Sequence, residues 1–163
     1  MTADMINAWA LVGGAAALSL SGVGSALGAG AAGSSAVGAW KKCYVQKKPA
    51  PFLLAAFVGA PLSQTIYGFI LMLIIQGKAK AISEAVVAGT AVTANWPLLL
   101  GAGIFAGLGM GFSAWMQGKA AAGASDAFAE TGEGFTNYLI VLGIIETVAL
   151  FIMVFTLMLV QGA

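Results

Sequence analysis

One acidic residue interrupts the most apolar segment of the chain. Glu146 stands within "VLGIIETVALF", with long apolar runs on both sides. An ionised carboxylate at mid-bilayer depth costs about 3 kcal/mol or more unless it is paired or protonated, so such a residue is functional by default. The alternative is that hydrogen bonds neutralise Glu146 and that it only ties helices together.

The chain offers no internal counter-charge for this carboxylate. The sequence contains no arginine, and none of its lysines lies at a matching depth. The partner of Glu146 is therefore a proton, a bound cation or a group on another chain.

A second polar set occurs in the stretch "GAPLSQTIYGF". Four of its residues are spaced by three and four positions and so share one helical face: Ala60, Ser63, Gln64 and Tyr67. Pro61, in the same stretch, lacks an N–H and frees a backbone carbonyl one turn earlier.

These residues offer oxygen ligands at membrane depth. Gln117, at the end of a later apolar stretch, adds a second amide. One carboxylate, two amides, a hydroxyl and a carbonyl form an all-oxygen set, which suits a hard cation such as Na⁺. The expected ligands are Glu146, Gln64, Gln117, Ser63 and the backbone carbonyl of Ala60. Taken singly, Ser63 and Gln64 are interpreted as hydrogen-bonding groups between helices.

The elements that must position these residues are membrane-spanning helices. Apolar residues occupy 60% of the 163 positions and charged residues 8%, far from the balance of a soluble domain. Four continuous apolar stretches are each long enough for the ~20 residues that cross a bilayer as a helix: residues 8–32, 52–75, 96–115 and 135–160. A closed strand barrel would alternate instead.

The remaining composition excludes several functions. With no histidine, and with Cys43 as the one cysteine, we expect no zinc site and no intramolecular disulfide. The net charge of +1 favours neither nucleic acid nor a strongly anionic partner. Residues 1–7 carry Asp4 and no basic residue, so we expect the first apolar stretch to be a helix rather than a signal peptide.

Charge placement predicts the orientation in the membrane. The first connection holds four lysines: Lys41, Lys42, Lys47 and Lys48. The second connection carries Lys78, Lys80 and Glu84. By the positive-inside rule the first connection is cytoplasmic, the third connection (residues 117–134) lies on the same side, and both termini lie outside.

The chain contains an internal repeat. The stretches "SGVGSALGAGAAGSSAVGA" and "AGLGMGFSAWMQGKAAAGA" align at a constant offset with four matched glycines. The second and fourth apolar stretches are both bulky and finish on a Gln-Gly pair, at Gln76 and Gln161. We therefore expect two tandem helical hairpins, residues 1–80 and 81–163, of which the second carries Glu146.

Small residues recur every four positions in the two glycine-rich helices. Gly24 and Gly28 follow this spacing, as do Gly103, Gly107 and Gly111, and such faces let neighbouring backbones approach closely. Slender and bulky helices alternate along the chain. This alternation suits two concentric layers, with the slender helices inside and the bulky ones outside. The alternative is an ordinary bundle packed by the same small residues.

Together these features resemble a known family. The tandem hairpins, the glycine-rich helices and the motifs "PLSQTIYGF", "AWMQGKAAAG" and "ETVALF" look like the rotor-ring proteolipid, subunit K, of bacterial V-type ATPases, particularly the sodium-translocating kind. The resemblance covers nearly the whole chain. It implies an all-α membrane protein whose identical subunits form a ring with inner and outer layers.

The resemblance also implies a role for each site residue. Glu146 resembles the ion-carrying carboxylate, and Gln64 and Gln117 resemble the two glutamine ligands. Ser63 stands where the family has a threonine, which keeps the hydroxyl. Ala60 stands for a residue that gives its backbone carbonyl.

Tyr67 resembles the tyrosine that hydrogen-bonds the carboxylate in the closed site. The sequence departs from the family at Leu62, where a glycine is common, and at Thr147 and Val148, where a tyrosine is expected soon after the glutamate. These changes in bulk bear on how tightly the site closes and leave the ligand set intact. No carboxylate stands near Pro61, so we expect one ion for each four-helix unit.

The resemblance further implies partners. The ring would turn against a stator membrane protein that supplies an arginine, coupled to ATP hydrolysis or synthesis in soluble subunits. Asp126, Glu130 and Glu133 are candidates to touch the central stalk, although a solvated acidic loop is the simpler interpretation. We expect no catalytic site and no bound nucleotide, because the glycines lie within helices and lack the Lys-Ser/Thr ending of a phosphate loop.

Two alternatives stay open. A rotor protein of the same fold could carry H⁺, although Gln64 and Gln117 count against it, because a protonated carboxylate needs one hydrogen bond and not a cage of ligands. A small channel-forming or structural tetraspan protein would place Glu146 in a water-filled pore or make it dispensable.

Overall fold

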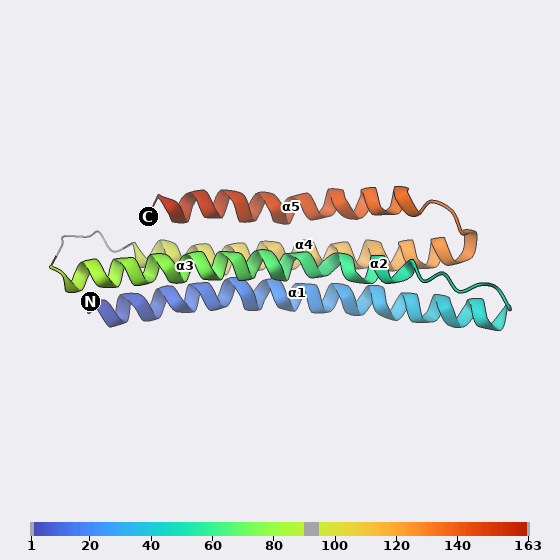
Figure 1. The fold of residues 1–163 in the computed structure, drawn as a ribbon, viewed down its shortest axis with the longest axis horizontal. Coiled ribbons are helices and arrows are strands. Elements are labelled where there is room, and N and C mark those ends of the chain that lie inside the picture. The colour runs from blue at the N-terminus through green and yellow to red at the C-terminus, as the bar shows by residue number, and fades with distance from the viewer. Residues whose placement is uncertain (1, 90–94, 163) are drawn as a thin grey trace.

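The computed structural model describes residues 2–89 and 95–162, and its helices run side by side along one long axis (Figure 1). The elements in chain order are α1 (Ala3–Val45), α2 (Leu54–Gly59), η1 (Ala60–Leu62), α3 (Ser63–Val87), α4 (Trp96–Thr131) and α5 (Phe135–Gln161). Both chain ends lie at one end of the bundle, and the α1–α2 and α4–α5 connections lie at the other (Figure 1).

Among the residues that the structure describes, four helical rods are long and apolar enough to cross a membrane. They are α1, the continuous rod from Leu54 to Val87, α4 and α5. Throughout residues 2–89 and 95–162 no strand occurs. The prediction of an all-α fold with four spans is confirmed, and the hairpin boundary predicted at residues 80 and 81 lies within α3.

The helices extend beyond the apolar stretches that predicted them. Lys41 and Lys42 lie in the last turns of α1, and the lysines and the glutamate of the predicted second connection lie in α3. The predicted third connection is helical as far as Thr131. The predicted extent of the connections is therefore wrong, because apolar runs mark only the part of a helix that suits hydrocarbon, whereas Ala, Lys and Glu also favour helix in water.

Backbone geometry, rather than polarity, ends these helices. Gly132, with φ of 72°, caps α4 and donates its N–H to the carbonyl of Phe128 at 2.8 Å. Gly134, with φ of 82°, precedes α5. Glycine reaches this left-handed conformation without a steric penalty, which is why it commonly follows the last helical turn. The two glycines therefore set the tight turn between α4 and α5.

The two slender helices pack backbone to backbone. A Cβ on Gly24 of α1 would overlap the backbone of Gly111 on α4, and a Cβ on Gly118 of α4 would overlap the backbone of Gly28 on α1. Any larger residue at these points would force the helices apart. The close contact of α1 with α4 therefore depends on the small-residue faces found in the sequence.

The bulky helices form the second layer of the molecule. The helix α3 packs on α1, α5 packs on α4, and α3 and α5 also contact each other. Large apolar side chains of α5, such as Ile144, Val148 and Phe155, are exposed on the surface. Within one molecule, the slender helices α1 and α4 thus lie on one side and the bulky helices α3 and α5 on the other.

Candidate ion-binding site

A polar layer separates two apolar clusters inside the bundle. The cluster nearer the chain ends includes Leu71, Met110 and Ala149, and the cluster nearer the lysine-rich end includes Phe57, Ala121 and Leu142. Three helices each place one of the predicted site residues in the interval between the clusters: Gln64 on α3, Gln117 on α4 and Glu146 on α5. Residues far apart in the sequence therefore meet at one depth.

Two side chains hold the carboxylate of Glu146. The Tyr67 hydroxyl donates a hydrogen bond to Oε1 at 2.6 Å, and Nε2 of Gln117 donates to Oε2 at 3.4 Å. The short bond from Tyr67 is typical of a hydroxyl that donates to an ionised carboxylate. Because these three residues come from α5, α3 and α4, the half-buried carboxylate joins three helices.

The two glutamines are fully buried and bonded to each other. Gln64 and Gln117 are both 0% exposed, and Nε2 of Gln64 donates to Oε1 of Gln117 at 2.8 Å. Nε2 of Gln117 also donates to the backbone carbonyl of Leu142 at 3.0 Å. Buried amides are stable only when paired, so these bonds fix the orientation of both side chains.

Ser63 and Ala60 complete the set from the start of α3. The Ser63 hydroxyl lies 3.2 Å from Oε1 of Gln64 and 3.2 Å from the carbonyl oxygen of Ala60, and its single proton serves one of these acceptors at a time. Ala60 belongs to η1, the short 3₁₀ turn that contains Pro61. Because proline has no N–H, the regular α-helical ladder is interrupted here.

All six residues predicted for the site belong to this connected set. One position differs from expectation: the sequence predicts Gln117 at the cytoplasmic end of the third span, but it lies in the interior of α4, which continues to Thr131. The reason is again that the helix extends beyond its apolar stretch. Ion binding by the set stays a prediction.

The donor set carries a single formal charge. Apart from the Glu146 carboxylate, the oxygens of the set are neutral amide, hydroxyl and carbonyl oxygens. One carboxylate balances one monovalent cation or one proton. Amide, hydroxyl and carbonyl oxygens are ligands that hard cations accept.

Sequence reasoning missed a serine in the same layer. Ser113 donates its hydroxyl to the carbonyl of Ile145 at 3.0 Å and so ties α4 to α5 next to Glu146. Ser113 stands four residues before Gln117, a spacing that places both on one helical face. That spacing is the signal that could have found it.

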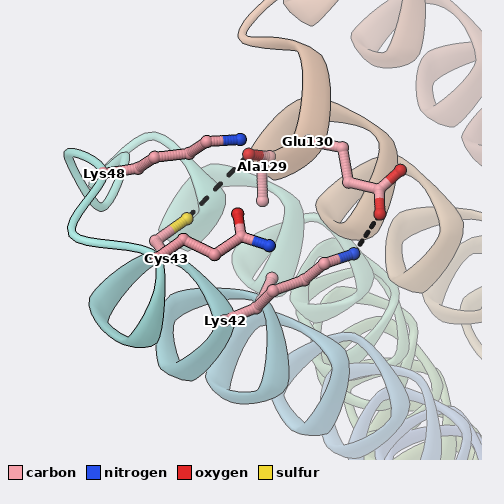
Figure 2. A pocket seen from close by; sticks show the side chains of 7 residues that line it. Lys42, Cys43, Lys48, Ala129 and Glu130 are labelled. Atoms are coloured by element: carbon pink, nitrogen blue, oxygen red, sulfur yellow. Dashed lines mark hydrogen bonds and ion pairs between the residues drawn. The ribbon is translucent and has the colours of Figure 1, made fainter.

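A separate pocket lies at the lysine-rich end of the bundle, between the ends of α1 and α4 (Figure 2). Its volume is about 250 Å³. Lys42 forms an ion pair with Glu130, and Sγ of Cys43 lies 3.9 Å from the carbonyl oxygen of Ala129. Glu130, expected in a solvated loop, thus lies in α4 and pairs with α1.

Fold and polar layer together define a class: a four-span membrane protein with a hydrogen-bonded carboxylate between two apolar clusters. Residues 100–159, which cover most of α4 and α5, match the family model of the ATP synthase C-subunit. The second hairpin is therefore similar to the C-subunit of ATP synthase over these residues. No curated protein matches the chain.

Proposed function

We propose that the chain is the rotor-ring proteolipid of a V-type ATPase and carries Na⁺ across the membrane on Glu146 as the ring turns. Rotation of the ring is coupled to ATP hydrolysis or ATP synthesis in other subunits. One observation supports this proposal above the others: the connected set around Glu146, in which Gln64, Gln117, Ser63 and Tyr67 meet at one depth.

The amide pair favours Na⁺ over H⁺ as the cargo. A protonated carboxyl group needs an acceptor for its O–H, but the Gln117 nitrogen beside Glu146 is only a donor. The Tyr67 hydroxyl could accept this proton only by giving up the short bond that it donates to the carboxylate. Each of the two buried amide oxygens accepts one hydrogen bond, from Ser63 at Gln64 and from Gln64 at Gln117, and keeps a second lone pair. Coordination of a dehydrated cation is a use that both amide oxygens and the Ser63 hydroxyl share.

The proposed transport cycle follows from the cost of charge in lipid. Ile144 and Val148, on either side of Glu146 in α5, are exposed, so Glu146 travels close to lipid. There its charge must be balanced, which bound Na⁺ does. The hydroxyl of Tyr67 holds the carboxylate toward the site. At the stator, an arginine of another polypeptide attracts the carboxylate, the ion leaves, and a new ion restores the closed site.

Assembly and orientation complete the proposal. Identical copies form a ring with α1 and α4 inside and α3 and α5 outside. The lysine-rich end faces the cytoplasm and the central stalk, and the termini face outward. Because the first hairpin has Pro61 at the repeat position of Glu146, each four-helix unit holds one ion.

The experiment is carbodiimide labelling of the detergent-solubilised protein at fixed pH, with and without Na⁺, followed by mass mapping. We expect slow labelling of Glu146 that Na⁺ suppresses and that K⁺ at equal ionic strength does not. Glu84 and Glu133, at the ends of the bundle, serve as internal controls whose labelling ignores Na⁺. Glu146→Gln removes the reactive group and identifies the labelled site.

Other results would select other functions. Labelling of Glu146 that follows pH but ignores Na⁺ would leave a proton-carrying rotor protein of the same fold. Rapid labelling, as fast as that of the control glutamates, would indicate a hydrated pore. Absence of selective reactivity at Glu146 would favour a structural tetraspan protein.

A further inference from the structure

One buried hydroxyl at the depth of the site has no partner. Among the described residues, Oγ of Ser25 is the buried side-chain oxygen or nitrogen that makes no hydrogen bond, and Ser25 is 2% exposed. On α1, Ala17 belongs to the apolar cluster nearer the chain ends and Ala32 to the other. Ser25 stands between them, so α1 contributes it to the polar layer.

Ser25 faces α3. Ser21 and Gly28 lie four residues before and three residues after it, on the same face of α1. A Cβ on Gly68 of α3 would overlap the Ser21 hydroxyl. A Cβ on Gly28 would overlap the backbone of Ala114 on α4 and would also lie 2.9 Å from Cβ of Pro61. Because α1 and α3 run in opposite directions, Ser25 lies opposite the midpoint between these two contacts.

Gln64 stands at that midpoint and has hydrogen-bonding capacity to spare. Its Nε2 carries two N–H groups, of which one donates to Gln117, and its Oε1 has two lone pairs, of which Ser63 uses one. The Ser25 hydroxyl can both donate and accept. The register of the two helices therefore brings two buried polar groups with complementary capacity to the same level of the α1–α3 contact.

We propose that Ser25 is a positioning residue of the ion site. Its hydroxyl hydrogen-bonds the amide of Gln64 through one buried water molecule, and so holds Oε1 of Gln64 in place for the ion. This inference rests on the proposed function of the Glu146 site, and it adds a contribution from the inner helix to a site otherwise built from α3, α4, α5 and the 3₁₀ turn.

A rival explanation is purely structural. A serine is small enough for the close α1–α3 contact, and its hydroxyl would then be an unpaired group that the fold tolerates. Under that explanation, replacing Ser25 by alanine would leave thermal stability unchanged or raised, because an unpaired buried hydroxyl is removed. The affinity of the site for Na⁺ would not change.

The experiment compares the Na⁺ concentration that half-protects Glu146 from carbodiimide in the wild type, Ser25→Ala and Ser21→Ala. Ser21 is the matched control, because it lies one turn away on the same face and its hydroxyl already bonds the carbonyls of Ala17 and Leu18 at 2.8 and 2.9 Å. We expect the half-protecting Na⁺ concentration to increase about tenfold in Ser25→Ala, which is the equivalent of one hydrogen bond, and less than about twofold in Ser21→Ala.

Two further arms keep the outcome decisive. Ser25→Gly removes the hydroxyl with less bulk and replaces Ser25→Ala if that variant fails to assemble. An unchanged half-protecting concentration in the Ser25 variants overturns the inference. If Na⁺ does not protect Glu146 in the wild type, the proposed Na⁺ function fails, and the role of Ser25 is then tested by the pH midpoint of Glu146 labelling. A midpoint that shifts in Ser25→Ala but not in Ser21→Ala supports positioning by Ser25. Equal midpoints in the two variants overturn it.

Discussion

At the residue scale, the candidate site is held by bonds that fix its groups in advance. The amide of Gln117 receives a bond from Gln64 at its oxygen and gives bonds from its nitrogen to Leu142 and Glu146. Such an amide cannot rotate without losing several bonds at once. A site whose ligands are already oriented loses less side-chain entropy when it binds, and this favours affinity and selectivity.

The hydroxyl of Tyr67 gives the first test at this scale. Tyr67→Phe removes the 2.6 Å bond to Glu146 and keeps the bulk of the ring. Because hydrogen bonds to charged groups contribute about 1.5–3 kcal/mol, we expect the Na⁺ concentration that half-protects Glu146 to rise roughly tenfold to a hundredfold. Tyr138→Phe is the control, since Tyr138 packs against Phe57 outside the layer. Equal protection in Tyr67→Phe and the wild type would exclude Tyr67 from closing the site.

The sequence was sufficient to group the large polar residues and Ser63, which adjoins Gln64, but Ser113 and Ser25 were not predicted. Gln64 and Glu146 stand out because amides and carboxylates are costly inside apolar helices. A serine in such a helix usually bonds a carbonyl of its own helix, as Ser125 does to Ala121. Ser113 carries one sequence signal, its spacing of four residues from Gln117. Ser25 differs from Ser125 only through the packing of neighbouring helices, which the sequence does not display.

At the element scale, the contact between α1 and α4 fixes the distance between the hairpins. Gly24 meets Gly111 without side chains between them. The glycine spacing predicted such a face, and the structure identifies which glycines use it, since Gly38 of α1 has no atom within 4 Å of an added Cβ. Sequence spacing alone does not separate the two kinds of glycine, because both fit the same small-residue pattern.

Alanine substitutions distinguish the glycines that α1 uses to contact α4 from those that it does not. Gly24→Ala places a Cβ on the backbone of α4, an overpacking that costs about 1–3 kcal/mol. We expect the melting temperature of the detergent-solubilised protein to fall by roughly 2–10 °C. Gly38→Ala should leave it unchanged or slightly higher, since alanine favours helix more than glycine does. Equal melting temperatures for the two variants would contradict backbone contact at Gly24.

At the scale of the whole molecule, the two ends of the bundle differ. Lys42, Lys48 and Glu130 gather at the end that holds the α1–α2 and α4–α5 connections (Figure 2). Both chain ends lie at the opposite end (Figure 1). The excess of lysine near the first end predicts that it is cytoplasmic.

Single cysteines test this orientation. In a Cys43→Ala background, Gln46→Cys marks the lysine-rich end and Gly162→Cys marks the other, and both positions are exposed. We expect a membrane-impermeant maleimide to label Gln46→Cys only in inverted vesicles and Gly162→Cys only in intact cells or spheroplasts. The opposite pattern would reverse the orientation. Labelling of both positions from the same side would contradict the placement of the two ends on opposite faces of the membrane.

The continuity of α4 has a mechanical consequence. Gln117 beside the carboxylate and Glu130 beside Lys42 belong to one uninterrupted helix, about 20 Å apart at ~1.5 Å per residue. The slender helix α1 runs alongside α4 without a break and contacts it through the glycine faces. We expect such a pair of helices to resist twisting. A lateral force applied at Glu146 would then move the lysine-rich end together with the rest of the molecule, with little torsional deformation between them.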